Sequence, residues 1–217
     1  MGFLSIFRKS QNISVIPLNG IIAPNMGRRK GLNLNEIDKN IEDAFSVKNL
    51  KAVALQINSP GGSPVQSELI YNKIRLLAEK NKVKVITIAE DVAASGGYML
   101  MCAGDELLAN KSSIVGSIGV ISASFGFKDL IEKLGVKRRI FTAGENKYFL
   151  DPFVDVQDKE VEKLIKVQVS IFENFKALVL KNRKEKIDAD KVCNGEFWTG
   201  EQGIVLGLVD SNETLVT

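Results

Sequence analysis

The sequence contains no histidine, and this absence restricts the catalytic chemistry open to the chain. A serine or cysteine nucleophile cannot be paired with an imidazole base, which removes every Ser-His-Asp and Cys-His mechanism. Any general base must therefore be a lysine, a carboxylate or a tyrosine.

Cysteine is nearly as scarce, with only Cys102 and Cys193 in the chain. The two match no metal-binding spacing, and isolated cysteines are typical of buried, reduced thiols rather than of a disulfide framework. The sequence thus predicts no disulfide, no metal, no cofactor and a cytoplasmic location.

A charge bias and long apolar runs are also missing. The 29 basic and 26 acidic residues are mixed along the chain, so no basic stripe indicates a nucleic-acid partner. Residues 1–9 hold a short apolar patch, far below the roughly 20 apolar residues of a spanning helix and without a signal-peptide core. We expect a flexible tail over residues 1–12, with peripheral membrane contact through residues 1–9 as the alternative.

Strand and helix patterns alternate along the rest of the chain. Strands are predicted at 13–18, 51–57, 83–88, 105–110, 114–122 and 136–141. Helices are predicted at 33–45, 64–77, 98–103, 127–134 and 158–181. Ser63 is expected to cap the second of these, with Pro64 at its first position and Gln66 completing a capping box. This alternation indicates an α/β fold of right-handed βαβ units with a mainly parallel sheet. No repeat or low-complexity linker interrupts the chain, so residues 1–217 are predicted to form a single domain.

Two glycine-bearing loops follow predicted strands, which is where sites in parallel sheets gather. Residues 58–64 read Asn-Ser-Pro-Gly-Gly-Ser-Pro, and residues 92–98 read Val-Ala-Ala-Ser-Gly-Gly-Tyr. Small neighbours leave the Ser95 hydroxyl open to a ligand, and a helix start beside it supplies backbone N–H groups. Ser95 is the candidate nucleophile, although Ala93 breaks the full nucleophile-elbow pattern and a plain tight turn is the alternative.

Four motifs together resemble the signal peptide peptidase A family, the S49 serine peptidases, which include the SohB-type proteins. They are Asn-Ser-Pro-Gly-Gly at 58–62, Ala-Ser-Gly-Gly-Tyr at 94–98, Gly-Ser-Ile-Gly-Val at 116–120, and Phe-Trp-Thr-Gly at 197–200 with Gly-Leu-Val-Asp at 207–210. The resemblance extends in order from Val15 to Asp210. It implies a crotonase/ClpP-like fold and a Ser-Lys dyad.

The resemblance also implies a role for particular residues. Ser95 matches the family's nucleophile, Lys147 its general base, and Ser117 the serine that orients the lysine. Gly62 matches an oxyanion-hole glycine, and the Gly96 N–H is a plausible second donor. Since a free lysine has a pKa of roughly 10.4, the resemblance implies that the base is desolvated in an apolar cleft. Tyr98, Cys102, Trp198 and the phenylalanines are expected in the core instead.

The sequence therefore predicts an ATP-independent serine endopeptidase that cleaves apolar, extended peptides, signal-peptide remnants among them, through an acyl-enzyme. The alternatives are a crotonase-type acyl-CoA hydratase or thioesterase and a catalytically silent oligomeric scaffold. An acyl-CoA enzyme would require a carboxylate base in the cleft and a basic nucleotide-binding surface, and neither can be identified in the sequence.

Assembly is predicted as well. The helix at 158–181 carries Val167, Val169 and Ile171 off its main apolar face, which suggests a second buried surface. In single-domain relatives, the serine and lysine of one site come from neighbouring subunits of a ring. The resemblance thus implies a homo-oligomer with a shared dyad.

Overall fold

The structure is a computed structural model that describes residues 11–25, 27, 31–144 and 146–213. The chain forms two compact units, one of Met1–Gly119 with Asn174–Thr217 and the other of Val120–Glu173. The prediction of a single domain stays a prediction. The membrane contact predicted for residues 1–9 lies outside the described residues, as does most of the predicted tail, and Asn12 already opens the first strand.

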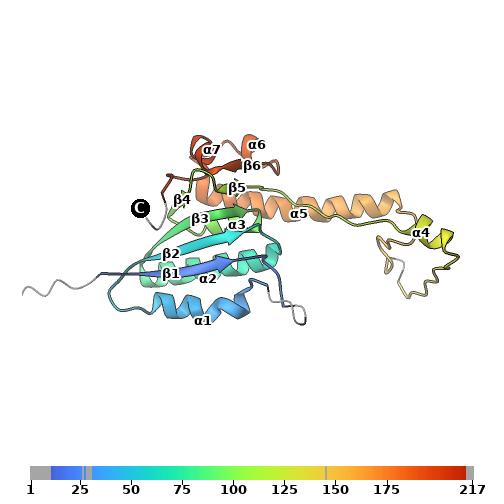
Figure 1. Ribbon diagram of the computed structural model, residues 1–217, viewed down its shortest axis with the longest axis horizontal. Coiled ribbons are helices and arrows are strands. Elements are labelled where there is room, and N and C mark those ends of the chain that lie inside the picture. Colours follow the sequence, from blue (N-terminus) through green and yellow to red (C-terminus); the bar gives the residue numbers. More distant parts are fainter. Residues whose placement is uncertain (1–10, 26, 28–30, 145, 214–217) are drawn as a thin grey trace, which may run out of the picture. The chain divides into compact units, whose positions relative to one another are not determined.

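Within the described residues, the first unit is built on a six-stranded sheet in the order β1-β2-β3-β5-β6, with β4 also paired to β3 (Figure 1). The strands are β1 Asn12–Asn19, β2 Leu50–Ser59, β3 Lys84–Ala94, β4 Glu106–Ala109, β5 Ile114–Gly116 and β6 Phe197–Thr199. Every pair is parallel except β5 with β6. The predicted mainly parallel α/β fold is confirmed.

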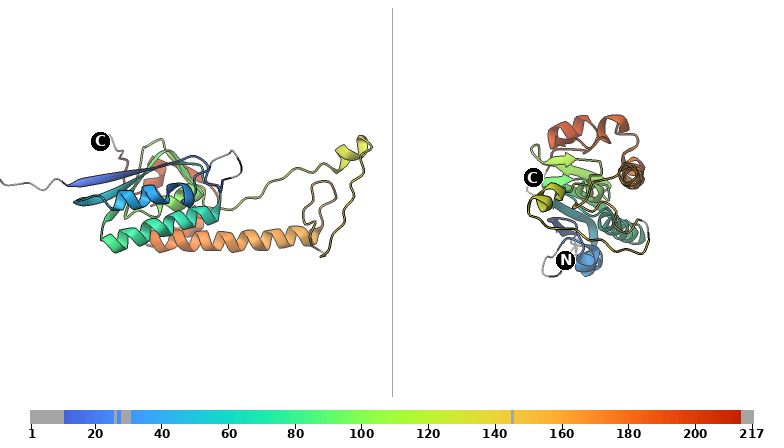
Figure 2. Two further views of the ribbon diagram at one scale, coloured as in Figure 1. Left: turned by 90° about the horizontal axis from the view of Figure 1, so that it is seen from below. Right: turned by 90° about the vertical axis from the view of Figure 1, so that its right-hand side faces the viewer.

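Helices α1 Leu34–Phe45, α2 Pro64–Asn81, α3 Gly96–Met101 and the end of α5 Asp158–Arg183 cover this sheet mainly on one face (Figure 2). Helices α6 Ala189–Val192 and α7 Gly200–Val205 lie next to its β6 edge (Figure 1). Helices α1 and α3 contact the sheet, and α2 contacts both of them (Figure 2). The last turns of α5 lie beside α2, where the Asn182 amide donates to the Tyr71 hydroxyl at 3.0 Å.

The starts of α1 and α2 follow from their capping residues. The Asn33 side chain caps α1, and Ser63 caps α2 with Pro64 in its first turn, as the sequence predicts. Gln66 departs from the expected capping box, because its side-chain oxygen accepts the Leu34 N–H at 3.1 Å. That hydrogen bond joins the two helix starts.

The core of the first unit surrounds β2, β3 and α3. Leu55, Ile57 and Val85 are fully buried, and each such side chain stabilises the fold by roughly 1.5–3 kcal/mol. Tyr98 is also fully buried, with its hydroxyl donating to the Leu208 carbonyl at 2.8 Å. Burial raises the pKa of Cys102 to about 12, which keeps this thiol protonated.

The core placement of Tyr98 and Cys102 is confirmed, whereas Trp198 is half-buried. The core placement of the phenylalanines is wrong for Phe125, Phe141 and Phe197, which are exposed in the single chain.

Strand β3 is longer than the prediction of residues 83–88, and the extra length positions the site. Residues 86–89 pair with β4, and residues 92–94 pair with β5. The exposed Asp91 interrupts the apolar pattern between these two parts, which is why the sequence does not show one strand. The result is a strand that ends directly at Ser95.

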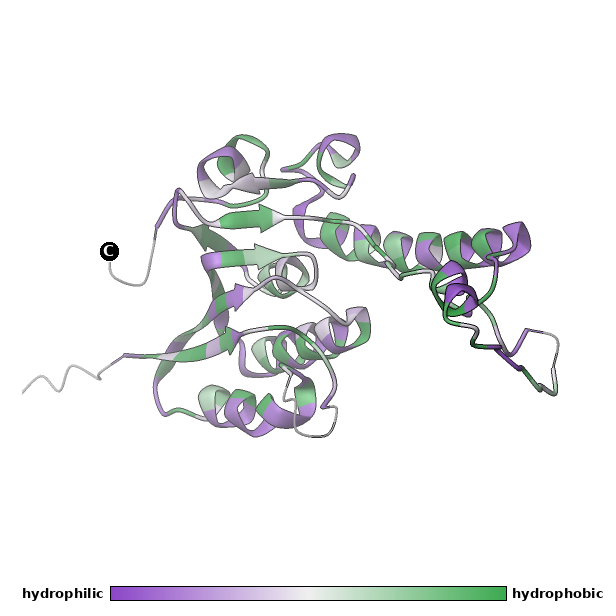
Figure 3. Ribbon diagram, turned by 45° about the vertical axis from the view of Figure 1, so that its right-hand side comes forward, coloured by the Kyte–Doolittle hydropathy of each residue, from purple (hydrophilic) through white to green (hydrophobic). Residues whose placement is uncertain are grey.

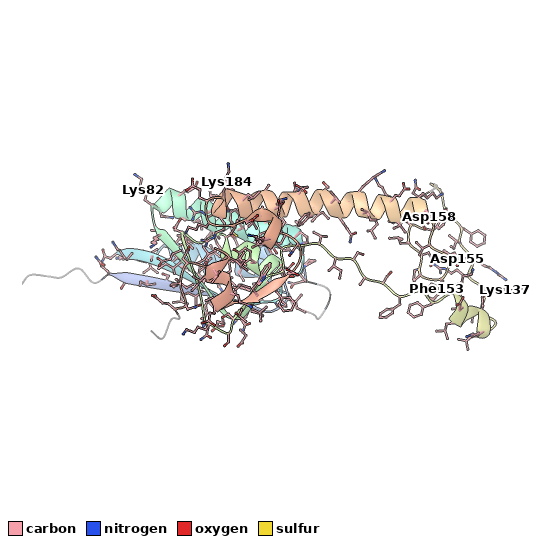
Figure 4. The ribbon with its side chains drawn as sticks, turned by 90° about the horizontal axis from the view of Figure 1, so that it is seen from above. Lys82, Lys137, Phe153, Asp155, Asp158 and Lys184 are labelled. Carbon is pink, nitrogen blue, oxygen red and sulfur yellow. The ribbon has the colours of Figure 1, made fainter. Side chains whose placement is uncertain are left out.

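The second unit holds α4 Lys128–Lys133 and the beginning of α5. The rings of Phe125, Phe127 and Phe153 form a row, with centroids 6.2 and 5.7 Å apart. Arg138 lies over the Phe153 ring at 5.4 Å and pairs with Asp151 at 2.9 Å. The hydrogen bond from the Phe153 N–H and, to a smaller extent, the hydrogen bond from Arg138 lower the pKa of the Asp151 carboxyl. Figure 4 labels Phe153 in this unit.

Two strand predictions are wrong. Residues 136–141 are irregular, because Arg138 turns to Asp151 and no strand pairs with this segment among the described residues. The strand predicted at 114–122 ends at Gly116, because Gly116 and Ser117 both adopt positive φ. Strand geometry does not continue through such residues.

Helix α5 confirms the long helix predicted from residue 158, but its apolar face is divided. Phe175 and Val179 are buried, whereas Val161 and Ile165 are 40% and 51% exposed. Hydrophobic and hydrophilic residues alternate along the helix (Figure 3). Of the predicted second surface, Val167 and Val169 are exposed and Ile171 is half-buried.

Candidate active site

Ser95 occupies a strained turn between β3 and α3. Its φ is 53° and its ψ is −121°, a combination outside the regions that residues with a Cβ normally occupy. Two backbone hydrogen bonds hold it: the Ser95 N–H donates to the Gly116 carbonyl at 2.8 Å, and its carbonyl accepts the Met99 N–H at 3.0 Å. The hydroxyl does not cap α3. A strained strand-to-helix turn of this kind presents a nucleophile, even though Ala93 breaks the sequence pattern.

The loop after β2 lies against this turn. A Cβ on Gly61 would be 2.6 Å from the Gly96 nitrogen and 2.8 Å from the Ser95 Cβ, so only glycine permits the approach. The loop is held in turn by Ile22, whose N–H donates to the Gly61 carbonyl at 2.9 Å and whose carbonyl accepts the Ser63 N–H at 2.7 Å. The two glycine loops predicted from the sequence therefore meet.

The two predicted oxyanion donors are available. Among the described residues, no acceptor takes a hydrogen bond from the Gly62 N–H or the Gly96 N–H. A Cβ on Gly96 would lie 3.4 Å from the Gly61 Cα, so both donors belong to the same pair of touching loops as Ser95. Backbone N–H groups left free beside a hydroxyl are what an oxyanion hole requires.

Ser117 stands at the end of the neighbouring strand β5. It has a φ of 53°, and its N–H donates to the Glu196 carbonyl at 2.6 Å. The residue before it, Gly116, supplies the carbonyl that accepts the Ser95 N–H. The turns that carry Ser95 and Ser117 are thus linked through one backbone group.

Lys147 belongs to the second unit. Its N–H donates to the Gly144 carbonyl at 3.2 Å, and its side chain is exposed. The structure brings together Ser95, Ser117 and both glycine loops within the first unit. The pairing of Lys147 with Ser95 and the desolvation of its amine stay predictions.

Strand β6 is not among the strands predicted from the sequence, although Phe197–Thr199 belong to the Phe-Trp-Thr-Gly motif. The Glu196 carbonyl accepts the Ser117 N–H, and the half-buried Trp198 packs on Gly116. The Phe-Trp-Thr-Gly motif was the sequence signal that could have indicated a role for β6. Three residues are too short to show a strand period.

The described residues show neither a candidate metal site nor a helix that could span a membrane. No group of three or more Cys, Asp or Glu residues there is placed to hold a metal ion. None of the helices in those ranges has the length and apolar character needed to cross a bilayer.

The chain has a ClpP-like fold: the Clp protease family model matches residues 40–115, and the α/β sheet is mainly parallel. The model of Peptidase family S49 matches residues 78–217. The chain belongs to peptidase family S49.

Several relatives carry peptidase names. A putative protease of Synechocystis sp. is 32% identical over 92% of this chain and 69% of its own length. The putative signal peptide peptidase SppA of Enterococcus faecium is 30% identical over 93% of this chain and 60% of its length.

A further relative has a different name. The Na(+)/H(+) antiporter NhaA of Brucella melitensis is 48% identical over 91% of this chain, which spans only 27% of that protein. The match therefore gives no reason to assign antiporter activity to this chain.

Proposed function

We propose that this chain is a serine peptidase that cleaves peptides through an acyl-enzyme on Ser95, with Lys147 as general base. The observation that carries the proposal is the strained Ser95 turn, which lies against Gly61 of the glycine loop after β2. The next residue of that loop, Gly62, and the residue after Ser95, Gly96, have N–H groups with no acceptor among the described residues. Membership of peptidase family S49 and relatives named as peptidases support it.

In the proposed reaction, the Ser95 Oγ attacks the scissile carbonyl carbon while the neutral Lys147 amine accepts the hydroxyl proton. The Gly62 and Gly96 N–H groups stabilise the oxyanion, and losing one such donor costs about 2.7–4 kcal/mol. The C–N bond then breaks, and the leaving amine takes the proton from Lys147. Water hydrolyses the Ser95 ester by the same base, so no ATP or cofactor enters any step.

The proposed substrates are apolar, extended peptides, with signal-peptide remnants suggested by the relative named SppA. Ala93, Ala94 and Gly61 surround the nucleophile with small, uncharged groups. We therefore expect small or aliphatic residues just before the cut. A peptide library analysed by mass spectrometry checks this, and strict cleavage after Lys or Arg would contradict it.

We also propose a homo-oligomeric ring in which Lys147 of one subunit completes the Ser95 site of its neighbour. In the single chain, several large apolar side chains of the second unit are strongly exposed: Ile121 88%, Phe125 79%, Leu134 69% and Phe141 92%. Exposed apolar surface of this kind marks protein interfaces. A neighbouring subunit would both cover these side chains and desolvate the exposed Lys147 amine.

A fluorophosphonate probe tests the proposed nucleophile directly. We expect one covalent adduct, mapped by peptide mass spectrometry to Ser95, and none in Ser95→Ala. The matched control is Ser112→Ala, which removes an exposed serine and should leave labelling unchanged. A chain that is not labelled, or an adduct on another serine, would overturn the proposal.

A further inference from the structure

The last strand of the sheet contacts the backbone that shapes the candidate site. β6 pairs antiparallel with β5, with Gly116 opposite Phe197 and Val115 opposite Trp198. We call residues 194–199 the β6 strap. None of its residues has a role in the reaction proposed above.

The strap holds the turn of Ser117 through its backbone. The Ser117 N–H donates to the Glu196 carbonyl at 2.6 Å, and the Gly195 N–H donates to the Ile118 carbonyl at 3.0 Å. Ser117 has a φ of 53°, so its backbone needs such partners to keep this conformation.

Trp198 contacts the residue that links the two serine turns. A Cβ on Gly116 would lie 2.8 and 2.9 Å from the Cε3 and Cζ3 atoms of Trp198, so the indole ring rests on the bare Gly116 Cα. The Gly116 carbonyl accepts the Ser95 N–H at 2.8 Å. The Gly116 backbone therefore connects the Trp198 ring to the Ser95 turn.

Backbone hydrogen bonds attach the strap to neighbouring segments on both sides of Trp198. Before Trp198 these are the bonds of Glu196 and Gly195 given above, and Asn194 and Glu196 also exchange two hydrogen bonds of 3.0 Å within the strap. After Trp198, Thr199 and Gln202 form a capping box, and the Gly200 N–H donates to the Ser113 carbonyl at 2.7 Å. These attachments on both sides define the position of the Trp198 ring.

We infer that Trp198 is a positioning residue for the Ser95 turn. By packing on Gly116, the ring keeps the carbonyl of that residue where it holds Ser95 at its positive φ. The role in peptide cleavage rests on the proposed function, whereas the effect on the turn does not. Trp198 itself touches no reacting atom.

Hydrogen exchange of the full chain tests the positioning. In Trp198→Ala, the peptides that cover Ser95 and Ser117 should exchange at least about tenfold faster, because both N–H groups lose a fixed acceptor. Trp198→Phe, which keeps a planar ring, should exchange like the wild type. The control is Phe45→Ala, which removes a buried ring from α1 and should leave these peptides unchanged. Unchanged exchange in Trp198→Ala would overturn the inference.

Kinetics test the consequence for the reaction. We expect kcat of Trp198→Ala to fall at least about tenfold with KM within about twofold, because small misplacements of a nucleophile are costly. Trp198→Phe should recover most of the rate. A wild-type kcat in a variant with faster exchange would overturn the role in the reaction. If Trp198→Ala does not fold, Trp198→Leu takes its place.

The two proposals fail in different ways. If the wild type is not labelled by fluorophosphonate, the proposed function is wrong, and the exchange data still decide whether Trp198 holds the turn.

Discussion

Two serines with positive φ stand at adjacent strand ends, and each is held by a backbone hydrogen bond. Ser95 and Ser117 both have a φ of 53°. Such conformations cost on the order of 1–3 kcal/mol each, comparable to the roughly 0.5–1.5 kcal/mol of one net hydrogen bond. The fold therefore supports strain at the predicted nucleophile, Ser95, and at Ser117, which the resemblance predicts to orient the lysine.

At the residue scale, Ser95→Ala and Lys147→Ala should each reduce kcat for peptide cleavage to background, because nucleophile and base act as one unit. Circular dichroism should show that both variants keep the fold. Lys111→Ala, which changes another exposed lysine, serves as the control for lost charge. Substantial turnover by either purified dyad variant would exclude the dyad.

The pH dependence belongs to the same scale. A lysine base works only when neutral, so kcat/KM should rise toward alkaline pH with a single inflection, and no histidine is present to add a second one near neutrality. Measurements from pH 5 to pH 10 check this. An optimum near pH 5 would indicate a carboxylate base instead.

At the element scale, the end of α5 fastens the C-terminal motif 207–210 to the sheet. Arg183 is only 2% exposed; it donates to the Gly207 carbonyl at 2.9 Å and to both Asp210 oxygens at 3.0 Å. Asp210 also accepts the N–H of Leu107 in β4 at 2.9 Å. This motif of the family therefore has a structural role here.

Asp210 makes these interactions with Arg183, which we call the Arg183–Asp210 clamp, sensitive to acid. Burial acts to raise its pKa, but hydrogen bonds from Arg183, Lys186 and the Leu107 N–H outweigh burial and lower the pKa from 3.8 to about 2. A lowered folded-state pKa contributes stability that is present above pH 4 and is lost as the pH falls toward 2. The contribution at neutral pH is about 2 kcal/mol, with the carboxylate partly screened by solvent.

Asp210→Asn should therefore lower the free energy of unfolding at pH 7 by about 2 kcal/mol and flatten its decline between pH 4 and pH 2. Arg183→Ala should cost about 3 kcal/mol, because it removes a buried guanidinium that donates to both Asp210 and the Gly207 carbonyl. Urea denaturation at pH 7 and pH 3 measures both. Lys191→Ala, which breaks an exposed pair with Asp188, should change stability by less than about 1 kcal/mol. If Asp210→Asn lowered the free energy of unfolding equally at both pH values, the proposed role of the ionised Asp210 in the Arg183–Asp210 clamp would be wrong.

At the scale of the whole molecule, the proposed site depends on assembly. If Ser95 and Lys147 of one site come from different subunits, activity should fall on dilution below the assembly constant. Mixing Ser95→Ala with Lys147→Ala should then restore part of the activity, because some interfaces carry both wild-type groups.

Co-assembly must be verified, for example by isolating mixed oligomers through a tag on one variant. Mixed oligomers as inactive as either parent would show that the dyad lies within one chain. Activity unchanged by dilution to the monomer, measured by light scattering, would lead to the same conclusion.

Local chemistry was readable from the sequence. The absence of histidine excluded imidazole catalysis, Asn33 and Ser63 marked helix starts, and Ser95 stood out as a hydroxyl among small residues after a buried strand. These features depend on near neighbours in the chain, so residue type and spacing are sufficient to predict them.

Only the tertiary structure decided how distant segments meet. Three features leave no periodic signal in the sequence: the long β3 that pairs with β2, β4 and β5, the irregular path of residues 136–141, and the contact of Trp198 with Gly116. Likewise, the positive φ of Ser95 depends on the Gly116 carbonyl of another strand. Strand pairing and backbone strain arise from packing between residues far apart in the chain, and local pattern does not encode them.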